Sequence, residues 1–491
     1  MTDAILAIDQ GTSSSRAMVF AADGQLLLQA QQEFACSYPH EGWVEQDPEQ
    51  IWLSVLTVCR EVLQQAKEQG IAIKGIGITN QRETTLVWRR DNFEAVYPAI
   101  VWQDRRTASY CDALKASGAE GLVQQKTGLC LDPYFSASKL HWILQQHPEI
   151  DPSELAFGTV DSFILWRLTL GQVHATDTTN ASRTALFNIR SLEWDPELLA
   201  LFAIPPAVLP QVKQSADYYG ETDPRWFGEA IPILALAGDQ QAAAIGQGCV
   251  RAGGLKSTYG TGCFALLNTG STCIDSSHRL LATVASTVQG KTQYALEGSI
   301  FAAGAVVKWL RDQLGVLASA AETEMLAASI PDNGGVYLVP AFTGLAAPHW
   351  RSDLRASISG LTFGCGKAHL ARAALEAVVY QTADLLSAMK ADGAVIENLQ
   401  IDGGMVNNHW FCQFLADVLD LQVMRPLQTE TTAFGVALLA GIQLQWYADL
   451  AALPSLVRAG SWFRPKMNDQ TRAQLLTEWH HEVQRLLAAS H

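Results

Sequence analysis

The sequence predicts an α/β protein made of two compact units, and three observations lead to this prediction. Apolar runs at residues 4–8 and 233–237 stop at an aspartate or at a Gly-Asp pair, as buried strands that end in tight turns do. Amphipathic helical spacing alternates with such strands along the chain. A chain of 491 residues has room for two or more domains, and the strand pattern starts again near residue 233. We therefore expect two domains, at residues 1–247 and 248–491.

The first domain is expected to begin with a meander of antiparallel strands. Strand patterns occupy residues 4–8, 16–20 and 26–28. The pair Asp23-Gly24 lies between the last two and is a hairpin signal. Three strands joined by such short connections predict an antiparallel start to the first sheet.

A helix and further strands are expected to follow this meander. Asp47 before Pro48 is a helix start signal, and apolar residues with helical spacing come directly after it. Residues 75–79 form another short apolar run, which is typical of a buried strand. We expect the segments 84–88 and 100–102 to continue the same sheet.

The second cycle of elements has the same character as the first. Its expected elements are a strand at 233–237, a helix of small residues at 241–247, a turn at 258–262, strands at 263–267 and 399–401, a helix at 407–420 and a last amphipathic helix. No low-complexity linker divides the chain, so the domain boundary rests on this repetition alone.

Composition excludes several classes of partner. The chain has 34 Lys and Arg against 49 Asp and Glu, a net charge of −15 that would repel phosphate backbones, so we expect no nucleic-acid partner. No apolar stretch reaches 18 residues, so we expect no integral membrane segment. The N-terminus lacks the basic region of a signal peptide, and the nine cysteines form no CxxC pair. These features favour a cytoplasmic enzyme.

Three segments bring a carboxylate and a glycine to the end of an apolar strand. They contain Asp9 and Gly11, Gly238 and Asp239, and Asp402 with the two glycines after it. A fourth turn holds Thr261 between two glycines. Each turn taken alone is more often a simple turn than a site. Their occurrence together indicates phosphate binding, because glycine lets backbone N–H groups approach an anion closely.

Neighbouring side chains fit the same interpretation. The hydroxyls of Thr12, Ser13 and Ser14 are potential donors to phosphate oxygens, and Arg16 could add a positive charge. A carboxylate beside phosphates would repel them unless a divalent cation lay between. Asp9 is therefore a candidate ligand for Mg²⁺, which commonly takes one or two carboxylates and keeps several waters.

At four segments the residues resemble a known family. Residues 38–45 read YPHEGWVE, 77–85 read GITNQRETT, 238–243 read GDQQAA and 258–263 read TYGTGC. These motifs closely resemble the glycerol kinases, a branch of the FGGY carbohydrate kinases. The resemblance covers nearly the whole chain, and the motif at Asn80 to Glu83 is specific to that branch. Residues 132–140, DPYFSASKL, are also similar to a family signature.

The resemblance implies an actin-like ATPase fold of the ribonuclease H-like type, with two related domains flanking a central cleft. It also implies transfer of a phosphoryl group from ATP, with Mg²⁺, to glycerol, giving sn-glycerol 3-phosphate. A homodimer or homotetramer is the family expectation. A wrong ligand would leave buried polar groups of the glycerol site unpaired, at about 1–3 kcal/mol each.

Site residues follow from the resemblance by matching positions. Glycerol is expected to contact Arg82, Glu83, Trp102, Tyr134, Asp239, Gln240 and Phe264. ATP is expected to contact Thr12, Ser13, Ser14, Arg16, Thr261, Gly304, Gly404 and Asn408. Asp239 is implied as the catalytic base at the start of a helix, and Asp9 as the catalytic residue that holds the metal.

Three departures and three alternatives accompany this interpretation. Lys308 replaces a glutamine common in the family, and residues 346–351, AAPHWR, replace a stretch that reads GAPYWD in the family. Residues 226–230 replace a loop associated with fructose 1,6-bisphosphate inhibition in some relatives, so that regulation is not expected. The alternatives are an FGGY kinase for a pentulose or another polyol, an actin- or Hsp70-like ATPase, and a non-catalytic regulator. The first shares the phosphate-binding turns but does not need Arg82 and Glu83 beside Trp102. The second predicts ATP turnover without glycerol.

Overall fold

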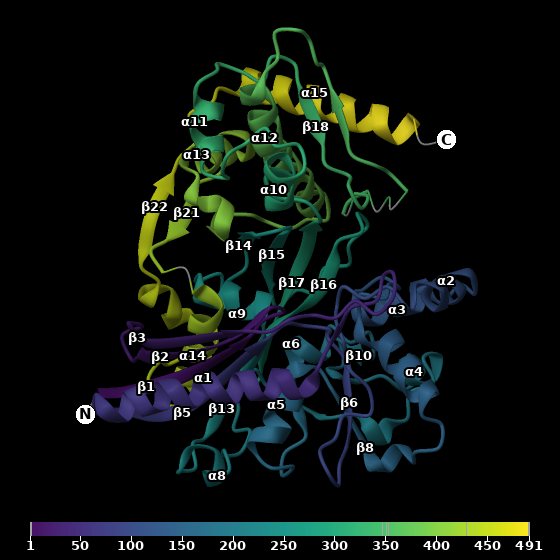
Figure 1. The fold of residues 1–491 in the computed structure, drawn as a ribbon, viewed down its shortest axis with the longest axis vertical. Helices are drawn as coiled ribbons and strands as arrows, with labels where there is room; N and C mark the ends of the chain where they lie inside the picture. Colours follow the sequence, from purple (N-terminus) through teal and green to yellow (C-terminus); the bar gives the residue numbers. More distant parts are fainter. Residues whose placement is uncertain (1, 346, 350, 352, 429, 490–491) are drawn as a thin grey trace.

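The computed structural model describes residues 2–489 except 346, 350, 352 and 429. The chain forms two lobes, each built on one large sheet (Figure 1). The order of strands in the first sheet is β13 (Ile233–Gly238), β5 (Ile71–Asn80), β1 (Thr2–Gln10), β2 (Ser14–Ala21) and β3 (Leu26–Glu33). The predicted antiparallel meander is confirmed, since β2 pairs antiparallel with both β1 and β3.

The second sheet has seven strands in the order β16 (Leu281–Val288), β17 (Lys291–Ile300), β15 (Cys263–Gly270), β14 (Gly254–Tyr259), β20 (Asn398–Asp402), β21 (Val423–Pro426) and β22 (Ala459–Phe463). It repeats the pattern of the first sheet. An antiparallel pair, β14 and β15, lies beside the parallel strands β20 and β21, as β1 and β2 lie beside β5 and β13. This repetition confirms the predicted pair of related α/β domains.

Helices cover both faces of the first sheet. Helix α1 (Pro48–Glu68) begins at the predicted signal, where the Asp47 carboxylate accepts a hydrogen bond from the Glu49 backbone N–H. Its apolar face packs on β2, β3 and β5. The other face is covered by α9 (Asp239–Gly246) and α14 (Thr431–Gln443).

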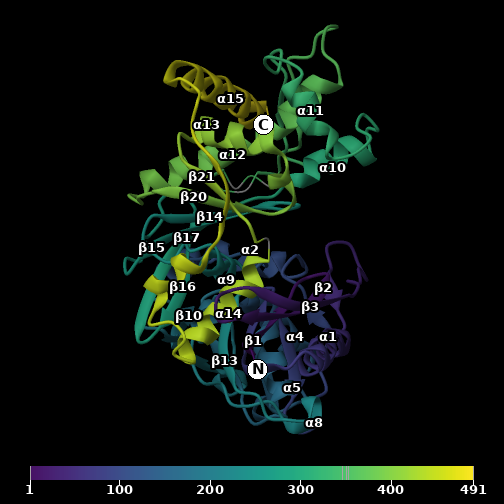
Figure 2. The ribbon, with the colours of Figure 1, turned by 90° about the vertical axis from the view of Figure 1, so that its left-hand side faces the viewer.

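Helix α14 comes from the C-terminal part of the chain but lies in the first lobe, beside β1 and α9 in both views (Figures 1 and 2). It crosses α9 where two glycines meet. A Cβ atom on Gly435 would lie 1.8 Å from the Ala242 carbonyl oxygen, and one on Gly246 would lie 2.0 Å from that of Thr431. The two backbones therefore approach each other closely at this crossing, as only glycine permits.

The long connection between β5 and β13 holds most of the smaller elements. Its helices are α2 (Ala108–Ala116), α3 (Glu120–Thr127), α4 (Ser136–Gln146), α5 (Val160–Leu168), α6 (Thr178–Ala181), α7 (Pro196–Leu201) and α8 (Pro224–Phe227). Its short strands are β6 (Leu86–Arg89), β7 (Ala99–Ile100), β8 (Leu155–Gly158), β9 (Ala175–Asp177), β10 (Phe187–Asn188), β11 (Glu193–Trp194) and β12 (Gln211–Lys213).

Two sequence predictions were wrong in this region. The segments 84–88 and 100–102 do not continue the first sheet, because β6 pairs with β8 and β7 pairs with β4 (Glu45–Gln46). The strand at 233–237 does not open the second sheet but closes the first, parallel to β5. An apolar run predicts a strand but carries no information about which neighbour it pairs with.

Helices of the second lobe pack around its sheet and its main hydrophobic core. They are α10 (Gly304–Asp312), α11 (Glu322–Ala328), α12 (Lys367–Ala391), α13 (His409–Leu419) and α15 (Asp469–Ala489), with a hairpin of β18 (Tyr337–Val339) and β19 (Ser357–Ser359). The predicted helices at 407–420 and at the C-terminus are confirmed as α13 and α15. Among the described residues no helix is both long and apolar enough to span a bilayer.

Candidate active site

The candidate site forms where the parallel strands of the first sheet end. Strands β1 and β13 both run parallel to β5, with Asp9 opposite Thr79 and Gly238 opposite Asn80. The carboxyl ends of these strands meet at one edge, which is where ligands bind in open α/β sheets. Asp239 comes directly after β13 and is the first residue of α9, as the sequence predicts.

The loop after β5 carries Arg82 and Glu83 in a tight turn. Glu83 has φ of +62°, and the Thr84 backbone N–H donates to the Arg82 carbonyl at 2.7 Å. A left-handed glutamate is a strained conformation that persists only where surrounding contacts hold it, and such positions gather at functional sites. Both side chains are about 2% exposed. The turn thus presents two buried charges of opposite sign.

Arg82 reaches from this turn to the start of α9. Its Nε lies 3.2 Å from Asp239 Oδ1. The stem of the arginine passes over Gly238, where a Cβ atom would lie 2.7 Å from Arg82 Cδ. Gly238 therefore makes room for the arginine that contacts the neighbouring Asp239.

Two residues that the sequence analysis missed complete this charge cluster. Glu297 on β17 accepts from Arg82 Nη1 at 2.6 Å and from Nη2 at 3.2 Å. Arg183, just after α6, donates from Nε to Glu83 at 2.6 Å and from Nη2 to Glu297 at 2.9 Å. Burial raises the pKa of Glu83, whereas the charges of Arg183 and Arg82 outweigh burial at Glu297 and lower its pKa to about 2.

Three predicted aromatic residues gather beside the charges. The ring of Trp102 lies 5.7 Å from that of Tyr134 and 6.3 Å from that of Phe264, both edge to face. Arg183 lies over the Tyr134 ring, 5.5 Å from its centre. Trp102 belongs to the first lobe and Phe264 to β15 of the second, so the aromatic group joins both lobes.

Gln240 follows Asp239 and is held by a lysine that the sequence analysis did not select. Lys256 on β14 donates from Nζ to Gln240 Oε1 at 2.5 Å. The lysine is completely buried, and this burial lowers its pKa. Since Oε1 accepts from the ammonium group, the Gln240 amide nitrogen is left to donate elsewhere.

The predicted phosphate-binding residues of the first lobe lie where β1 passes into β2, with Thr12 and Ser13 on the turn and Ser14 and Arg16 on β2. The Gly11 N–H donates to the Ser14 carbonyl at 2.9 Å and closes the turn that contains Thr12 and Ser13. Trp102 Nε1 donates to Thr12 Oγ1 at 3.0 Å, which joins this turn to the aromatic group. Arg16 pairs at 2.9 Å with Glu430, the residue before α14.

The matching turns of the second lobe also come together. The Thr261 carbonyl accepts from the Ala305 N–H at 3.0 Å, and the Gly304 N–H donates to Gly260 at 2.9 Å. Gly403, before Gly404, packs so closely that a Cβ atom there would lie 2.4 Å from the Tyr259 carbonyl. The two predicted turns of Thr261 and Gly404 and the predicted contact residue Gly304 are therefore adjacent, at the carboxyl ends of β14 and β20 and the start of α10.

Asn408 is the N-cap of α13. Its Oδ1 accepts from the Phe411 N–H at 2.9 Å and its Nδ2 donates to Thr323 at 3.2 Å. Helix capping accounts for the first of these two contacts without a ligand. The structure thus places Asn408 in the second lobe at the helix that follows the turn of Gly404.

The Asp9 carboxylate differs from the other acidic groups of the site in its lack of polar contacts to the residues that the structure describes. Among the described residues, its carboxylate accepts no hydrogen bond and forms no ion pair within 4.0 Å. Burial raises its pKa to about 7, the charge of Arg16 opposes this, and Asp239 adds to it. No group of three or more metal-ligating side chains is present in the described part of the chain. One carboxylate near a second fits Mg²⁺, which takes few protein ligands when phosphates and water supply the others.

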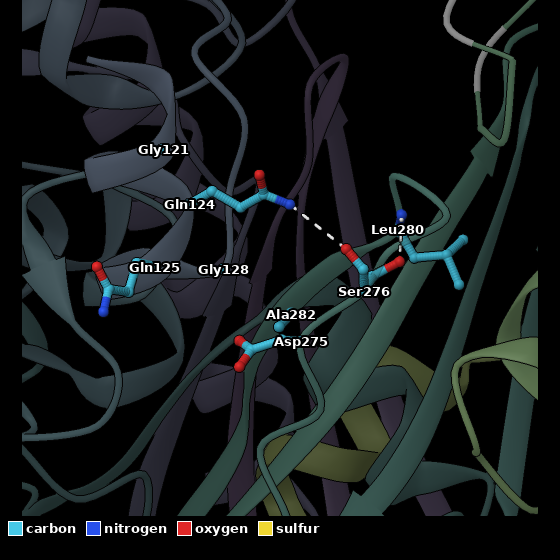
Figure 3. A pocket seen from close by; sticks show the side chains of 8 residues that line it. All are labelled: Gly121, Gln124, Gln125, Gly128, Asp275, Ser276, Leu280 and Ala282. Atoms are coloured by element: carbon cyan, nitrogen blue, oxygen red, sulfur yellow. Dashed lines mark hydrogen bonds between the residues drawn. The ribbon is translucent and has the colours of Figure 1, made fainter. Parts of the chain in front are cut away.

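A pocket of about 220 Å³ lies elsewhere, between α3 and the segment before β16 (Figure 3). Gln124 on α3 points toward this segment and donates to the Ser276 carbonyl at 3.4 Å. None of the residues that line the pocket is basic, and none is a predicted site residue. The pocket is therefore separate from the candidate active site.

A weak signal for the missed residues is present in the sequence. Lys256 is the one charged residue of β14, and Glu297 is the one charged residue in the buried second half of β17, where an unpaired charge would be costly. Such a residue predicts a buried partner but does not identify it. Arg183 lies in a loop without a pattern of its own.

Comparison with known proteins gives a family match over most of the chain. The N-terminal domain model of the FGGY family of carbohydrate kinases matches residues 4–246. The C-terminal domain model of the same family matches residues 255–444. Arg82, Glu83 and Asp239 lie within the first match, and Glu297 lies within the second.

Individual relatives have more specific names than the family as a whole. A glycerol kinase of Rhodospirillum centenum is 58% identical over 485 residues, which cover 98% of this chain and 97% of that protein. Glycerol kinase 1 of Pseudomonas aeruginosa is 52% identical over 490 residues, 99% of each. The crystal structure of Plasmodium falciparum glycerol kinase with ADP superposes with a TM-score of 0.94 at 35% identity, covering 99% of this chain and 98% of that one. A xylulose kinase from Lactobacillus acidophilus, with a TM-score of 0.90 at 23% identity and 99% coverage of both chains, shows the fold alone.

Proposed function

The chain belongs to the FGGY family of carbohydrate kinases, and we propose that it phosphorylates glycerol with ATP to give sn-glycerol 3-phosphate. The relatives named glycerol kinase, at 51–58% identity over nearly the whole chain, support glycerol as the substrate. One observation carries the proposal. The buried pair of Arg82 and Glu83, the partly exposed Asp239 and three aromatic rings together form the proposed glycerol site.

These groups suit a small neutral triol. Hydroxyl groups both donate and accept, so Glu83 can accept from one hydroxyl while Arg82 donates to another. The rings of Trp102, Tyr134 and Phe264 offer apolar walls for the carbon chain. An analogue without a matching hydroxyl would leave a buried polar group unpaired, at about 1–3 kcal/mol.

Asp239 is proposed as the base. The oxygen of the terminal hydroxyl forms a bond to the γ-phosphorus, the bond from that phosphorus to the β–γ bridging oxygen breaks, and the hydroxyl proton passes to the carboxylate. The transition state of phosphoryl transfer is largely dissociative, so the proton can leave late and a weak base suffices. Positioning of the hydroxyl by Asp239, Arg82 and Gln240 is then the larger contribution.

ATP is proposed to bind between the turns of the two lobes. The contacts would be Thr12, Ser13, Ser14 and Arg16 from the first lobe and Thr261, Gly304, Gly404 and Asn408 from the second. Mg²⁺, when bound, would neutralise charge on the phosphates. Asp9 would hold it, with Asp239 close by. The lobes would exclude water when they close, since water competes with glycerol as the acceptor.

Product analysis tests the proposal directly. The chain is incubated with Mg-ATP and glycerol, and phosphorus NMR is expected to show a glycerol 3-phosphate signal that grows as ATP is lost. Xylulose and erythritol at the same concentration serve as rival substrates. Faster phosphorylation of either would favour another polyol kinase. ADP formation at the same rate without any polyol would favour an ATPase.

A metal titration tests the role of Asp9. The Asp9→Asn variant is expected to need a higher Mg²⁺ concentration for half-maximal rate, because the ion loses its carboxylate ligand. Asp275→Asn, which removes a surface carboxylate paired with Arg190, is the control and should match the unsubstituted chain. Equal Mg²⁺ requirements in both variants would contradict the assignment.

We also propose the cellular location and the oligomeric state of the enzyme. A cytoplasmic location agrees with nine cysteines that are all unpaired. We propose a homodimer or homotetramer without a nucleic-acid partner, and light scattering behind size-exclusion chromatography would measure the mass of the assembly. A mass of about one chain would contradict this proposal.

A further inference from the structure

We propose that Glu297 and Arg183 are positioning residues for the substrate, which hold Arg82 and Glu83 in the geometry that binds the polyol. The inference deepens the proposed function and rests on it for the identity of the substrate. Neither residue is among the predicted site residues.

The contacts form a closed chain of charges. Glu297 uses both carboxylate oxygens on Arg82, at 2.6 and 3.2 Å, and Oε1 also accepts from Arg183 at 2.9 Å. Arg183 holds Glu83 at 2.6 Å, and Glu83 Oε1 lies 3.9 Å from Arg82 Nε. All four side chains are at most 2% exposed. Two acids and two bases alternate, so the cluster carries no net charge.

The bidentate contact with Glu297 determines which edge of the Arg82 guanidinium faces the proposed substrate. Because Nη1 and Nη2 are engaged by Glu297, the Nε edge is the one that reaches Asp239 at 3.2 Å. Fork-to-fork pairs fix the plane of a guanidinium as well as its position. Removing one of these two hydrogen bonds would allow the guanidinium to rotate away from Asp239, the proposed base.

Arg183 acts in the same way on Glu83. It donates from Nε to the glutamate and lies over the rings of Tyr134 and Phe135, with its guanidinium carbon 5.5 and 5.2 Å from their centres. Its Nη1 is buried and has no hydrogen-bond partner in the part of the chain that the structure describes. The two rings and the two carboxylates therefore hold the arginine in place, and the arginine holds the strained Glu83 turn.

Glu297 also connects the lobes. Arg82, Glu83 and Arg183 lie in the segment that matches the N-terminal family model, whereas Glu297 lies in the segment that matches the C-terminal one. Strand β17 is an inner strand of the second sheet, paired with β15 and β16. The polyol side of the site is thus anchored to the second sheet.

The test compares two buried glutamates. Glu297→Gln keeps the size of the side chain but weakens its bidentate contact with Arg82. The KM for glycerol is therefore expected to rise about 10- to 100-fold. The KM for ATP should stay within about twofold, because the nucleotide turns do not contact this cluster. Glu376→Gln is the matched control, since Glu376 is equally buried and pairs with Arg372 at 2.7 Å within the second lobe. It should leave both KM values within about twofold.

Three outcomes would overturn the inference. They are an unchanged KM for glycerol in Glu297→Gln, an equal rise in both KM values, or the same rise in Glu376→Gln. If Glu297→Gln does not fold, Arg183→Lys provides the second test, since it keeps the charge but loses the fork geometry. It should also raise only the KM for glycerol, and an unchanged value would overturn the inference.

The polyol preference of the unsubstituted chain is measured first, so that the two proposals fail separately. If another polyol is the better substrate, glycerol is wrong as the proposed substrate, and the same variants are then measured with that polyol. A selective rise in its KM would still support the positioning role. A KM unchanged with the preferred polyol would overturn it.

Discussion

Arg82 and Asp239 are in contact although one is buried and the other is open to the site. The Nε to Oδ1 distance is 3.2 Å, and the two side chains are 2% and 32% exposed. Arg82 thus holds Oδ1 of the Asp239 carboxylate, while the rest of that carboxylate stays accessible. A group that orients a hydroxyl and then takes its proton needs this combination of a fixed position and an accessible oxygen.

The first prediction concerns this carboxylate. Asp239→Asn keeps the shape of the side chain but removes the base, so kcat should fall about 10²- to 10⁴-fold. The KM for glycerol should change less, because the other polar contacts remain. Steady-state kinetics with saturating Mg-ATP provide the measurement, with Asp275→Asn as the surface control. Full activity in Asp239→Asn would show that another group accepts the proton.

The second prediction concerns the space above Gly238. A Cβ atom in Gly238→Ala would lie 2.7 Å from Arg82 Cδ and would displace the guanidinium. Small displacements of a positioning group are costly, so kcat/KM for glycerol should fall about 10- to 100-fold. Gly121→Ala is the control, because nothing lies within 4 Å of a Cβ atom there. If both variants kept full activity, the position of Arg82 would not matter for the substrate.

The third prediction concerns Lys256. Lys256→Met keeps the length of the buried side chain but removes the donor to Gln240 Oε1, so the glutamine amide loses its fixed orientation. The KM for glycerol should rise about tenfold, as expected for one lost hydrogen bond to a charged group. Lys126→Met, which removes a partly exposed lysine paired with Asp195, should leave it unchanged. A KM that changes in neither variant would rule out an influence of Lys256 on the substrate.

The fourth prediction concerns acid stability and His174. Its Nε2 lies 2.8 Å from the Phe157 carbonyl and its Nδ1 lies 3.2 Å from Arg90, so the charged form would face a guanidinium. Burial, more than Arg90, lowers the pKa of His174 to about 4. The unfolded chain then binds the extra proton first, near pH 6.5. Stability is therefore present above that pH and is lost as the pH falls from 6.5 to 4, by about 3 kcal/mol.

Urea unfolding between pH 4 and 8 measures this effect. The His174→Gln variant keeps an N–H donor for the Phe157 carbonyl but does not titrate. Its unfolding free energy should therefore depend less on pH between 6.5 and 4 than that of the unsubstituted chain. Parallel pH profiles for the two proteins would mean that His174 does not contribute.

Local signals explain what could be predicted from the sequence. An apolar run that ends at Asp9 or Asp239 defines a strand and a turn without reference to distant residues, and both elements are confirmed. The pairing of strands is not local, which is why the segment 84–88 was wrongly assigned to the first sheet. The partners of buried charges are also distant, since Glu297 is 215 residues from Arg82 and 114 from Arg183. Arg82, Glu83 and Asp239 lie in contact, as do Trp102, Tyr134 and Phe264, but the roles of the residues named by resemblance stay predictions.

The position of α14 has a consequence for how the protein is made. This helix covers β1, β5 and β13, and its Phe434 ring lies 5.5 Å from that of Phe20 on β2. While a ribosome is still adding residues before 431, the apolar surface that α14 covers on the first sheet stays exposed to water, although α9 is already made. The nascent chain must reach nearly its whole length before this surface is buried. A fragment that stops at residue 247 is therefore expected to aggregate when expressed alone, and to become soluble when a separate polypeptide supplies residues 248–491.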